Sequence, residues 1–436
     1  MKMAKQSVVI VGGGVSGLCA GRHLLKYPHK YNVVIYEMAS EIGGSWIYTD
    51  RIGTDENGCP VHTSMYANLR TNLAKESMAY PDFPFKENEA SYLPREDVLN
   101  YINDYTDHFD VRKLVKTLHK VDKISRKDNK WSINVTNCKT NEKVESTCDI
   151  VIICNGHCSV PRKAKIEGME TFPGSQIHSH DYRKTAPYSE QTVLVVGAGP
   201  SGLDISCDLA KIAKQVYLRH HSKYISGNKF PDNLIQKPDV VRISDKKIIF
   251  KDDTEITVDS IIYCTGYNHE FLFLDDSCQI TVDDNYVRPL YKQIINVNHP
   301  TMCFLGLQKY GPLFPLVDLQ MRFYLSYLEQ NFATTEEMTK DVEQFENSKK
   351  AAGTVKNHYH AIPAGLCEVY LEELVRLAKI EPIPTVMLRI HFHSAMSIMT
   401  DFMNFRKNVY KAIDGENFKL NGKVVEYKKP CPGIKC

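Results

Sequence analysis

The sequence predicts an α/β fold with two Rossmann-like dinucleotide-binding domains, the smaller inserted into the larger. Two glycine-rich fingerprints, Gly12–Gly17 and Gly197–Gly202, predict this architecture. Each follows a run of β-branched apolar residues, typical of a strand buried on both faces, and each precedes a helical pattern. Strand, glycine turn and helix in this order distinguish a dinucleotide site from a chance run of glycines. A chain of 436 residues also exceeds the usual size of a single core.

Composition excludes several classes of partner. Hydrophobic residues make up 43% of the chain and charged residues 24%, as in ordinary globular proteins, and the net charge is +2. That balance gives no reason to expect a nucleic acid or an anionic membrane as partner. The 13 cysteines are scattered without zinc-ligand spacing, so we expect buried free thiols, a reducing compartment and no metal site.

The chain shows no targeting segment and no membrane anchor. Residues Met1–Gln6 lead directly into the first strand, which leaves no room for a signal peptide, and no run of apolar residues is long enough to span a bilayer. We therefore expect a soluble, cytoplasmic protein. A secreted protein is the alternative if a signal peptide has been removed from the chain. Homo-oligomerisation stays open.

The first fingerprint has the features of a site for FAD or NAD. Its glycines permit a tight turn and let a pyrophosphate approach the N-terminus of the following helix. The next strand, Tyr31–Tyr36, ends in Glu37, 20 residues after Gly17. A carboxylate there accepts hydrogen bonds from both ribose hydroxyls of an adenosine and repels a 2′-phosphate. The turn Gly43–Trp46 that follows is either a surface turn with a structural tryptophan or a flavin-cradling segment, and its position after Glu37 favours FAD.

The second fingerprint differs at the position that decides cofactor choice. It repeats the strand as Thr192–Val196 and the turn as Gly197, Gly199 and Gly202. Its second strand ends in Arg219 and His220, where the first unit has Glu37. A guanidinium clamps a 2′-phosphate bidentately, so this site favours NADP.

The remaining patterns give the expected order of domains and elements. Residues 1–163 are expected to form the first part of the FAD-binding domain, 164–275 the NADP-binding domain, and 276–436 the second part of the FAD-binding domain with C-terminal helices. Within them we expect helices at 94–109, 203–213, 318–331, 368–379 and 391–405, an antiparallel meander over 115–135, a hairpin at 248–258, and strands at 149–156 and 260–267 that return the chain to the first domain.

Two dinucleotides in one chain limit the chemistry. NADPH gives a hydride to the flavin, and the reduced flavin then needs an electron acceptor. A C-x-x-C motif beside the flavin would indicate a disulfide reductase, and the sequence contains none. Dioxygen is the remaining common acceptor, and it requires a dry, closed pocket.

A stretch between the fingerprints carries a family resemblance. Phe172–Tyr182 follows the pattern F-x-G-x-x-x-H-x-x-x-Y, which resembles the signature of the flavin-containing monooxygenases. Together with Glu37, Gly43–Trp46, Thr71-Asn72, Arg219, Cys264–Tyr267 and the two fingerprints, the resemblance covers nearly the whole chain. Tyr182 matches the branch that oxygenates nitrogen and sulfur, because Baeyer–Villiger enzymes typically carry Trp there. Cys154-Asn-Gly156 stands where the family usually has Ala-Thr-Gly.

The resemblance implies a set of cofactor-binding residues. Gly12, Gly13, Gly14, Val15, Ser16 and Gly17 would hold the FAD pyrophosphate, with Glu37 on the ribose. Ser45, Trp46, His62 and Gln320 would line the flavin, Val121 would lie near the adenine, and Gly197, Gly199, Ser201, Gly202, Leu203, Asp204 and Arg219 would hold NADPH. Asn72 resembles the family's active-site asparagine, placed to hydrogen-bond a flavin hydroperoxide and the retained nicotinamide, and Thr71 would share the NADP contact. His178 and Tyr182 are expected to be structural linkers, with a proton-shuttling histidine as the alternative.

The resemblance also implies the reaction. It predicts NADPH- and O2-dependent oxygenation of a small amine or thioether, and the chain resembles soluble insect and bacterial members, including insect enzymes that convert pyrrolizidine alkaloids to N-oxides. The alternatives are a general N/S-oxygenase of xenobiotics, an uncoupled NADPH oxidase that makes peroxide and, from another class, a non-catalytic dinucleotide sensor. The substrate, the oligomeric state and the coupling efficiency are left open by the sequence.

Overall fold

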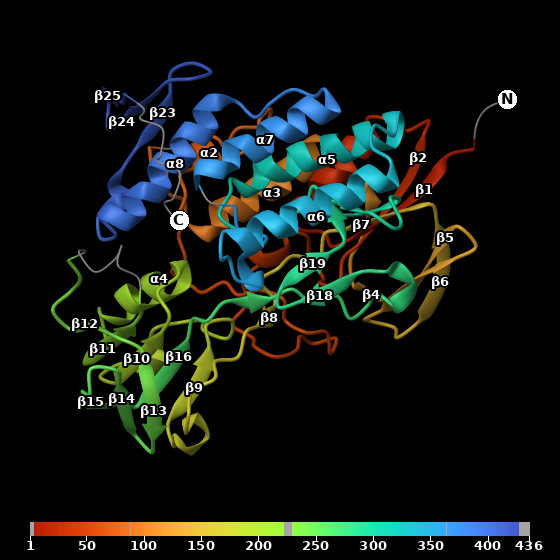
Figure 1. The fold of residues 1–436 in the computed structure, drawn as a ribbon. Coiled ribbons are helices and arrows are strands. Elements are labelled where there is room, and N and C mark those ends of the chain that lie inside the picture. Colours follow the sequence, from red (N-terminus) through yellow and green to blue (C-terminus); the bar gives the residue numbers. More distant parts are fainter. Residues whose placement is uncertain (1–3, 88, 222–228, 363, 427–436) are drawn as a thin grey trace.

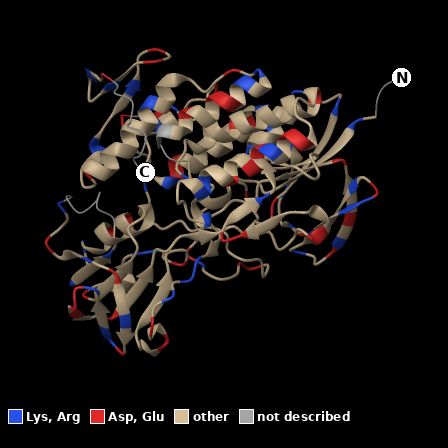
Figure 2. Cartoon of the chain, in the orientation of Figure 1, with Lys and Arg blue, Asp and Glu red and all other residues tan. Residues whose placement is uncertain are grey.

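The computed structural model describes residues 4–87, 89–221, 229–362 and 364–426. Figure 1 shows two units, a larger helix-rich one and a smaller one at the lower left, with the green strands of the smaller unit clearly separate from the helices above. The predicted α/β class with two dinucleotide-binding domains is confirmed. Lys and Arg alternate with Asp and Glu over both units (Figure 2), in keeping with the small net charge of +2.

A seven-stranded sheet forms the centre of the larger unit. Its strands are β1 Gln6–Val11, β2 Tyr31–Tyr36, β3 Val115–Lys116, β7 Ile150–Ile153, β20 Leu290–Tyr291, β21 Ile295–Asn296 and β22 Met302–Phe304. The order is β20-β21-β22-β7-β1-β2-β3, with the last five parallel. The carboxyl ends of these parallel strands meet at one edge, where a dinucleotide site is expected.

The two faces of this sheet bury different residues. Val8 and Ile10 of β1 pack into a core shared with the helices, whereas Val9 and Val11 pack against an antiparallel meander that covers the other face. The meander consists of β4 His119–Lys127, β5 Lys130–Asn137 and β6 Lys143–Cys148. The helices are α1 Val15–Leu25, α2 Lys75–Met78, α3 Arg95–His108, α5 Leu313–Gln330, α6 Thr335–Ala351 and α7 Ala364–Ala378.

The smaller unit contains a second parallel sheet with the order β12-β11-β10-β16-β9. These strands are β9 Ser175–His178, β10 Thr192–Val196, β11 Gln215–Arg219, β12 Leu234–Lys237 and β16 Ser260–Tyr263, and α4 Pro200–Leu209 follows β10. The antiparallel strands β13 Val240–Ser244, β14 Lys247–Phe250 and β15 Glu255–Thr257 complete the unit.

One predicted strand lies in a different sheet from the one expected. Residues 260–267 were predicted to return the chain to the first domain, but β16 pairs in parallel with β10 and is a central strand of the second sheet. The pattern was misleading because β7 and β16 occupy equivalent places, each beside the strand that leads into a glycine turn.

The two units are joined by two short strands that pair with each other. β8 Val160–Pro161 carries the chain out of the larger unit and β17 Tyr267–Asn268 carries it back, and the two pair antiparallel. The chain therefore leaves and re-enters the larger unit at one place, as the predicted insertion requires.

The C-terminal segment packs against α2 of the larger unit and extends toward the smaller unit. Figure 1 shows α8 Thr385–Thr400 above α4, with the strands β23 Tyr410–Ala412, β24 Phe418–Leu420 and β25 Lys423–Val424 beyond it. The helix predicted at 391–405 begins earlier, at Thr385, and ends at Thr400. A short 3₁₀ turn, Phe405–Lys407, follows a few residues later. The helix predicted from 318 begins at Leu313, and the strands β18 Thr281–Asp283 and β19 Tyr286–Arg288 precede it. None of the helices in the described ranges is both long and apolar enough to cross a bilayer.

Candidate active site with two dinucleotide turns

The first glycine turn leaves no room for side chains. Gly12 has φ of +105°, and a Cβ on it would lie 2.4 Å from the carbonyl oxygen of Cys154. A Cβ on Gly17 would lie 1.9 Å from the carbonyl oxygen of Gly12. The turn therefore crosses the end of β7 while α1 starts close above it, which is the geometry that brings a helix N-terminus to a pyrophosphate.

Glu37 holds this turn from the end of β2. Its carboxylate accepts hydrogen bonds from the amides of Gly13 at 2.6 Å and Ala39 at 2.7 Å. The residue is buried, which raises the pKa of its carboxyl, while the hydrogen bonds from these amides oppose the shift. Glu37 thus lies against the turn, in position to meet the ribose of a bound adenosine.

The segment Gly43–Trp46 packs against the same turn. The amide of Gly43 donates to the carbonyl oxygen of Gly13 at 3.1 Å, and a Cβ on Gly44 would lie 3.0 Å from the Cα of Gly14. Ser45 and Trp46 form a 3₁₀ turn and are half-buried. These contacts favour the interpretation of this segment as a wall of the first dinucleotide site over that of a free surface turn.

The other predicted flavin contacts are spread more widely. His62 lies beside Gly156, whose Cβ would be 3.3 Å from His62 Nε2, and burial together with His180 and His157 lowers the pKa of His62 to about 4. Val121 is a buried residue of β4 within the core below the sheet. Gln320 is completely buried. Its Oε1 accepts a hydrogen bond from the Gly306 amide at 3.0 Å, and its Nε2 donates to Gln308 Oε1 at 2.6 Å. Gln320 thereby fixes Gly306, where a Cβ would lie 2.9 Å from the Ser16 hydroxyl.

The second glycine turn has the same backbone contacts as the first at its first and third glycines. Gly197 has φ of +109°, and its Cβ would lie 2.5 Å from the carbonyl oxygen of Cys264. Gly202 would place a Cβ 1.8 Å from the carbonyl oxygen of Gly197. Gly199 is different, because its Cβ would meet nothing within 4 Å. Ser201 is half-buried and Leu203 is buried at the start of α4.

Arg219 lies where the sequence predicts, at the end of β11. Its guanidinium forms an ion pair with Asp239, whose carboxylate also binds Lys251 at 2.7 Å. Lys251 and Arg219 together hold the pKa of Asp239 below its usual range. The arginine is about one-quarter exposed, so its guanidinium is oriented by a carboxylate and still reaches solvent.

Thr71 and Asn72 lie where the two units meet. The amide of Thr71 donates to the carbonyl oxygen of Leu93 at 2.8 Å, and its hydroxyl accepts from the amide of Leu93 at 3.0 Å. Asn72 is half-buried, and its side chain makes no hydrogen bond to any described residue. An amide held in place by its neighbours but free of protein partners is available to a ligand.

Asp204 does not stand free beside the second turn. It accepts hydrogen bonds from the hydroxyl of Tyr66 and from Arg406, whose Nη1 lies 2.6 Å from its carboxylate. Asn68 donates to Asp208 at 3.1 Å, one turn further along α4. The N-terminal part of α4 is therefore attached to residues 66–72 of the other unit.

The stretch Phe172–Tyr182 connects the two units. β9 adds Ser175–His178 to the second sheet, and Tyr182 is buried with its ring 5.5 Å from that of Tyr66. The buried Arg183 donates to the carbonyl oxygens of Arg51, Thr63, His180 and Tyr182. Burial, then His180, lowers the pKa of His178 to about 4, so its ring is neutral at physiological pH. These contacts favour the structural role over a proton shuttle.

Both helix N-termini fit an anionic ligand. α1 and α4 begin at glycines with extended backbone, lack a capping side chain, and have no acidic residue in the first turn. By contrast, α6 begins with a complete capping box formed by Thr334 and Glu337. The first amides of α1 and α4 are thus left for a ligand, and the helix dipole favours a pyrophosphate there.

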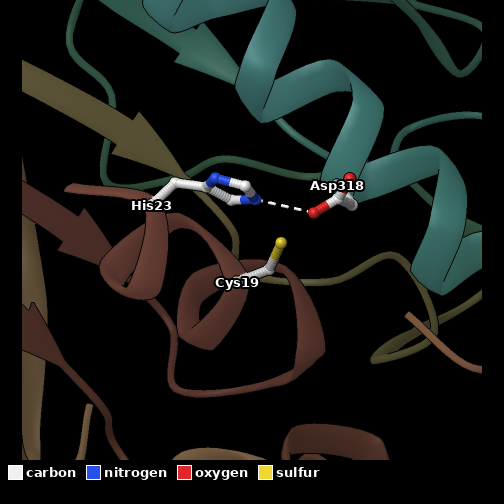
Figure 3. Close-up of side chains that lie close together, drawn as sticks. All are labelled: Cys19, His23 and Asp318. Carbon is white, nitrogen blue, oxygen red and sulfur yellow. Dashed lines mark hydrogen bonds and ion pairs between the residues drawn. The ribbon is translucent and has the colours of Figure 1, made fainter. Parts of the chain in front are cut away.

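A separate buried cluster joins α1 to α5. Cys19 and His23 lie one turn apart on α1 and face Asp318 of α5 (Figure 3), and His23 Nε2 is 2.6 Å from Asp318 Oδ1. Burial raises the pKa of Asp318, but His23 and Arg322 outweigh it and lower that pKa to about 2. The three side chains are of the types that bind metal ions. The imidazole nitrogen and the carboxylate oxygen that would be the best ligand atoms are, however, bonded directly to each other. We interpret the cluster as a buried tie between the helices.

Sequence reasoning missed several residues of this region. Tyr66, Asn68 and Arg406 link the units, and Gly306 approaches the first turn. No local motif marks Arg406, which meets Thr71 across 335 residues of sequence. Gly306 follows a short apolar strand, as Gly12 and Gly156 do, and that repeated pattern was the available signal.

The fold and the two turns define a protein with two dinucleotide sites, of the flavoprotein type. The chain matches the family described as flavin-binding monooxygenase-like over residues 4–233 and 230–403, and it belongs to that family. The predicted cofactors, FAD and NADP(H), are those of the family.

Individual relatives agree with the family. Senecionine N-oxygenase of Tyria jacobaeae is 33% identical over 421 residues, covering 94% of this chain and 91% of that protein. The Arabidopsis thaliana flavin-containing monooxygenase FMO GS-OX-like 2 is 33% identical over 82% of this chain and 81% of its own length. Among solved structures, S-allyl-L-cysteine S-oxygenase from Allium sativum superposes with a TM-score of 0.86 at 30% identity, covering 93% of this chain and 96% of that one.

Proposed function

We propose that this protein is an NADPH- and O2-dependent monooxygenase that oxygenates a nucleophilic nitrogen or sulfur of a small molecule. The observation that carries the proposal is a contrast between the two units: Glu37 follows the second strand of the first unit, whereas the second strand of the other unit ends in Arg219. A carboxylate at the first site would repel a 2′-phosphate and a guanidinium at the second would attract one, which supports FAD at the first site and NADPH at the second.

Each residue has a role in this reaction. When bound, FAD would take a hydride from NADPH and supply one oxygen atom of O2 to the substrate, the other leaving as water. The turn Gly12–Gly17 binds the FAD pyrophosphate, Glu37 accepts hydrogen bonds from the ribose hydroxyls, and Arg219 binds the 2′-phosphate of NADPH. The Asn72 amide orients the reacting groups and the nicotinamide, because its backbone is positioned by Thr71 and its side chain has no hydrogen-bond partner among the described residues.

Tertiary-amine alkaloids of the pyrrolizidine type are the substrates we favour, with N-oxides as products. The relative from Tyria jacobaeae, named for senecionine, supports this choice at 33% identity. Sulfur is the second candidate, because the S-allyl-L-cysteine S-oxygenase fold superposes over nearly the whole chain. An amine nitrogen and a thioether sulfur are both soft nucleophiles, so one site can serve both.

A substrate panel tests the proposal. FAD-loaded protein is incubated with NADPH and with senecionine, trimethylamine or S-allyl-L-cysteine, while NADPH loss, peroxide and oxygenated product are measured. We expect N-oxide in near-equal amount to the NADPH consumed for the best amine. Peroxide equal to NADPH with every compound would instead identify an oxidase, and nucleotide binding without NADPH consumption would identify a sensor.

A further inference from the structure

Arg406 lies outside every nucleotide motif but contacts both halves of the proposed site. It belongs to the 3₁₀ turn Phe405–Lys407, after α8. Its Nε donates to the carbonyl oxygen of Thr71 at 3.1 Å and its Nη2 to that of Arg70 at 3.3 Å. Its Nη1 donates to Asp204 of α4 at 2.6 Å. One planar guanidinium thus joins the Asn72 segment to the helix of the second turn.

The contacts around Arg406 leave little freedom to this junction. The Thr71 amide and hydroxyl are already bonded to Leu93, so its carbonyl oxygen is the group that remains for Arg406. Asp204 accepts a second bond from the hydroxyl of Tyr66, and burial and Asp204 raise the pKa of that tyrosine, which keeps it protonated as a donor. The Arg406 guanidinium lies 4.8 Å from the ring of the buried Phe405, which restricts its rotation.

Charge gives Arg406 a second effect. Asp204 is a carboxylate on the first turns of α4, close to where the pyrophosphate of NADPH would bind, and it is only 15% exposed. Unpaired, it would repel that anion and be costly to bury. Arg406 neutralises it, and an arginine keeps its charge at every physiological pH.

We propose that Arg406 is a positioning residue that couples occupancy of the second dinucleotide site to the placement of Asn72. The inference rests on the proposed function. When a nucleotide binds on α4, Asp204 holds Arg406, whose guanidinium holds the carbonyl oxygens of residues 70 and 71, and Asn72 is fixed at the flavin edge. Without Arg406 the segment of residues 66–72 no longer responds to the nucleotide.

Hydrogen exchange and equilibrium binding test this coupling without any turnover. FAD-loaded wild type, Arg406→Gln and Arg406→Lys are titrated with NADP+, and amide exchange of residues 66–72 is followed with and without nucleotide. In wild type, NADP+ should slow exchange in this segment. Arg406→Gln should abolish that slowing and raise the Kd for NADP+ about tenfold, which corresponds to about 1.4 kcal/mol.

The lysine variant separates charge from geometry. Lysine neutralises Asp204 as a point charge but cannot reach both carbonyls in a fixed fork. We expect a Kd for NADP+ close to that of wild type, while the exchange response of residues 66–72 is lost. Under turnover, the same variant should make more peroxide per NADPH than wild type.

Arg389 provides a matched control. It lies on α8, its side chain is 25% exposed as is that of Arg406, and it also binds a carbonyl oxygen and a carboxylate, both of Glu416. Arg389→Gln should change neither the Kd nor the exchange response. An equal effect in both glutamine variants, or an unchanged response in Arg406→Gln, overturns the coupling. A wild type that shows the response but oxygenates no substrate refutes the proposed function and leaves the coupling standing.

Discussion

A Cβ atom on Gly202 would lie 1.8 Å from the carbonyl oxygen of Gly197, and the same relationship joins Gly17 to Gly12 at 1.9 Å. In each pair, the third glycine of a fingerprint is required by the backbone of the first. This contact is internal to the protein and exists without any ligand. The third glycine therefore serves helix packing rather than cofactor contact, and this distinction can be tested.

Gly199→Ala and Gly202→Ala should fail in different ways. An alanine at Gly202 meets a backbone oxygen that cannot move aside, so we expect a loss of about 3 kcal/mol or more in unfolding free energy. Gly199 has φ of −70° and open space around it, so alanine there should keep stability within about 1 kcal/mol. Its NADP+ affinity should nevertheless fall, because a methyl group intrudes where the pyrophosphate approaches. Urea unfolding and NADP+ titration of both variants distinguish the two. Full NADP+ affinity in Gly199→Ala would place the pyrophosphate elsewhere.

Arg219→Ala should change the choice between NADPH and NADH. Removing the guanidinium removes a charge-assisted contact to the 2′-phosphate, so kcat/KM for NADPH should fall about 10- to 100-fold while that for NADH changes little. Initial-rate kinetics with both nucleotides measure this. Lys211→Ala, which removes a lysine that pairs with Asp208 on α4, is the control and should leave the ratio unchanged. Equal losses for both nucleotides in Arg219→Ala would contradict the assignment.

Asn72→Ala should separate flavin binding from oxygen transfer. The side chain has no described protein partner, so its removal should leave stability within about 1 kcal/mol and FAD bound. Loss of an oriented hydrogen-bond donor should lower product formation about 100-fold, with peroxide formed instead. The flavin absorbance, the melting temperature and the ratio of peroxide to NADPH are the measurements. Product formation at the wild-type rate would exclude Asn72 from the site.

Acid should destabilise the protein through its buried histidines. His360 is buried, accepts a hydrogen bond from the Val287 amide at 2.9 Å, and has its pKa lowered to about 3 by burial and by Lys309 and Lys349. The unfolded chain binds a proton on this residue below a pKa of about 6.5, whereas the folded protein does not until about 3. The unfolding free energy should therefore fall as pH drops from about 6.5, by up to about 1.4 kcal/mol per pH unit for this residue.

The variant His360→Gln tests that slope. Glutamine can accept the Val287 hydrogen bond but does not titrate, so its unfolding free energy should depend less steeply on pH between 6 and 4. Urea unfolding at several pH values compares the slopes, and the absolute stability of the variant does not matter. An identical slope in both proteins would assign the acid sensitivity to other groups, such as His62 or His391, whose pKa values burial also lowers to about 4.

The sequence predicts the parts of this structure that depend on only a few neighbouring residues. The glycine turns, Glu37 and Arg219 were predictable because each is fixed by its distance along the chain from a strand end. The strand at 260–263 was assigned to the wrong sheet because an apolar run does not specify its partner. Its pattern is the same in either sheet.

Contacts between residues far apart in the sequence could not be predicted. Arg406 and Thr71 are 335 residues apart, and His23 and Asp318 are 295 apart. Nothing in the composition near Arg406 differs from that of an exposed turn, and only the folded chain brings it to Asp204. Gln320 was predicted to line the flavin, and that prediction stays open, since its amide is bonded to Gly306 and Gln308 in the structure.

The paired strands β8 and β17 bear on how such a protein could arise and be rebuilt. Because Val160–Pro161 and Tyr267–Asn268 lie side by side, the ends of everything between them are already adjacent. Segments with adjacent ends can be inserted into a host or removed from it with little disturbance. The seven-stranded sheet takes no strand from this stretch. We expect that a short linker from Pro161 to Tyr267 would leave a flavoprotein with one dinucleotide site, a starting point for exchanging the electron donor.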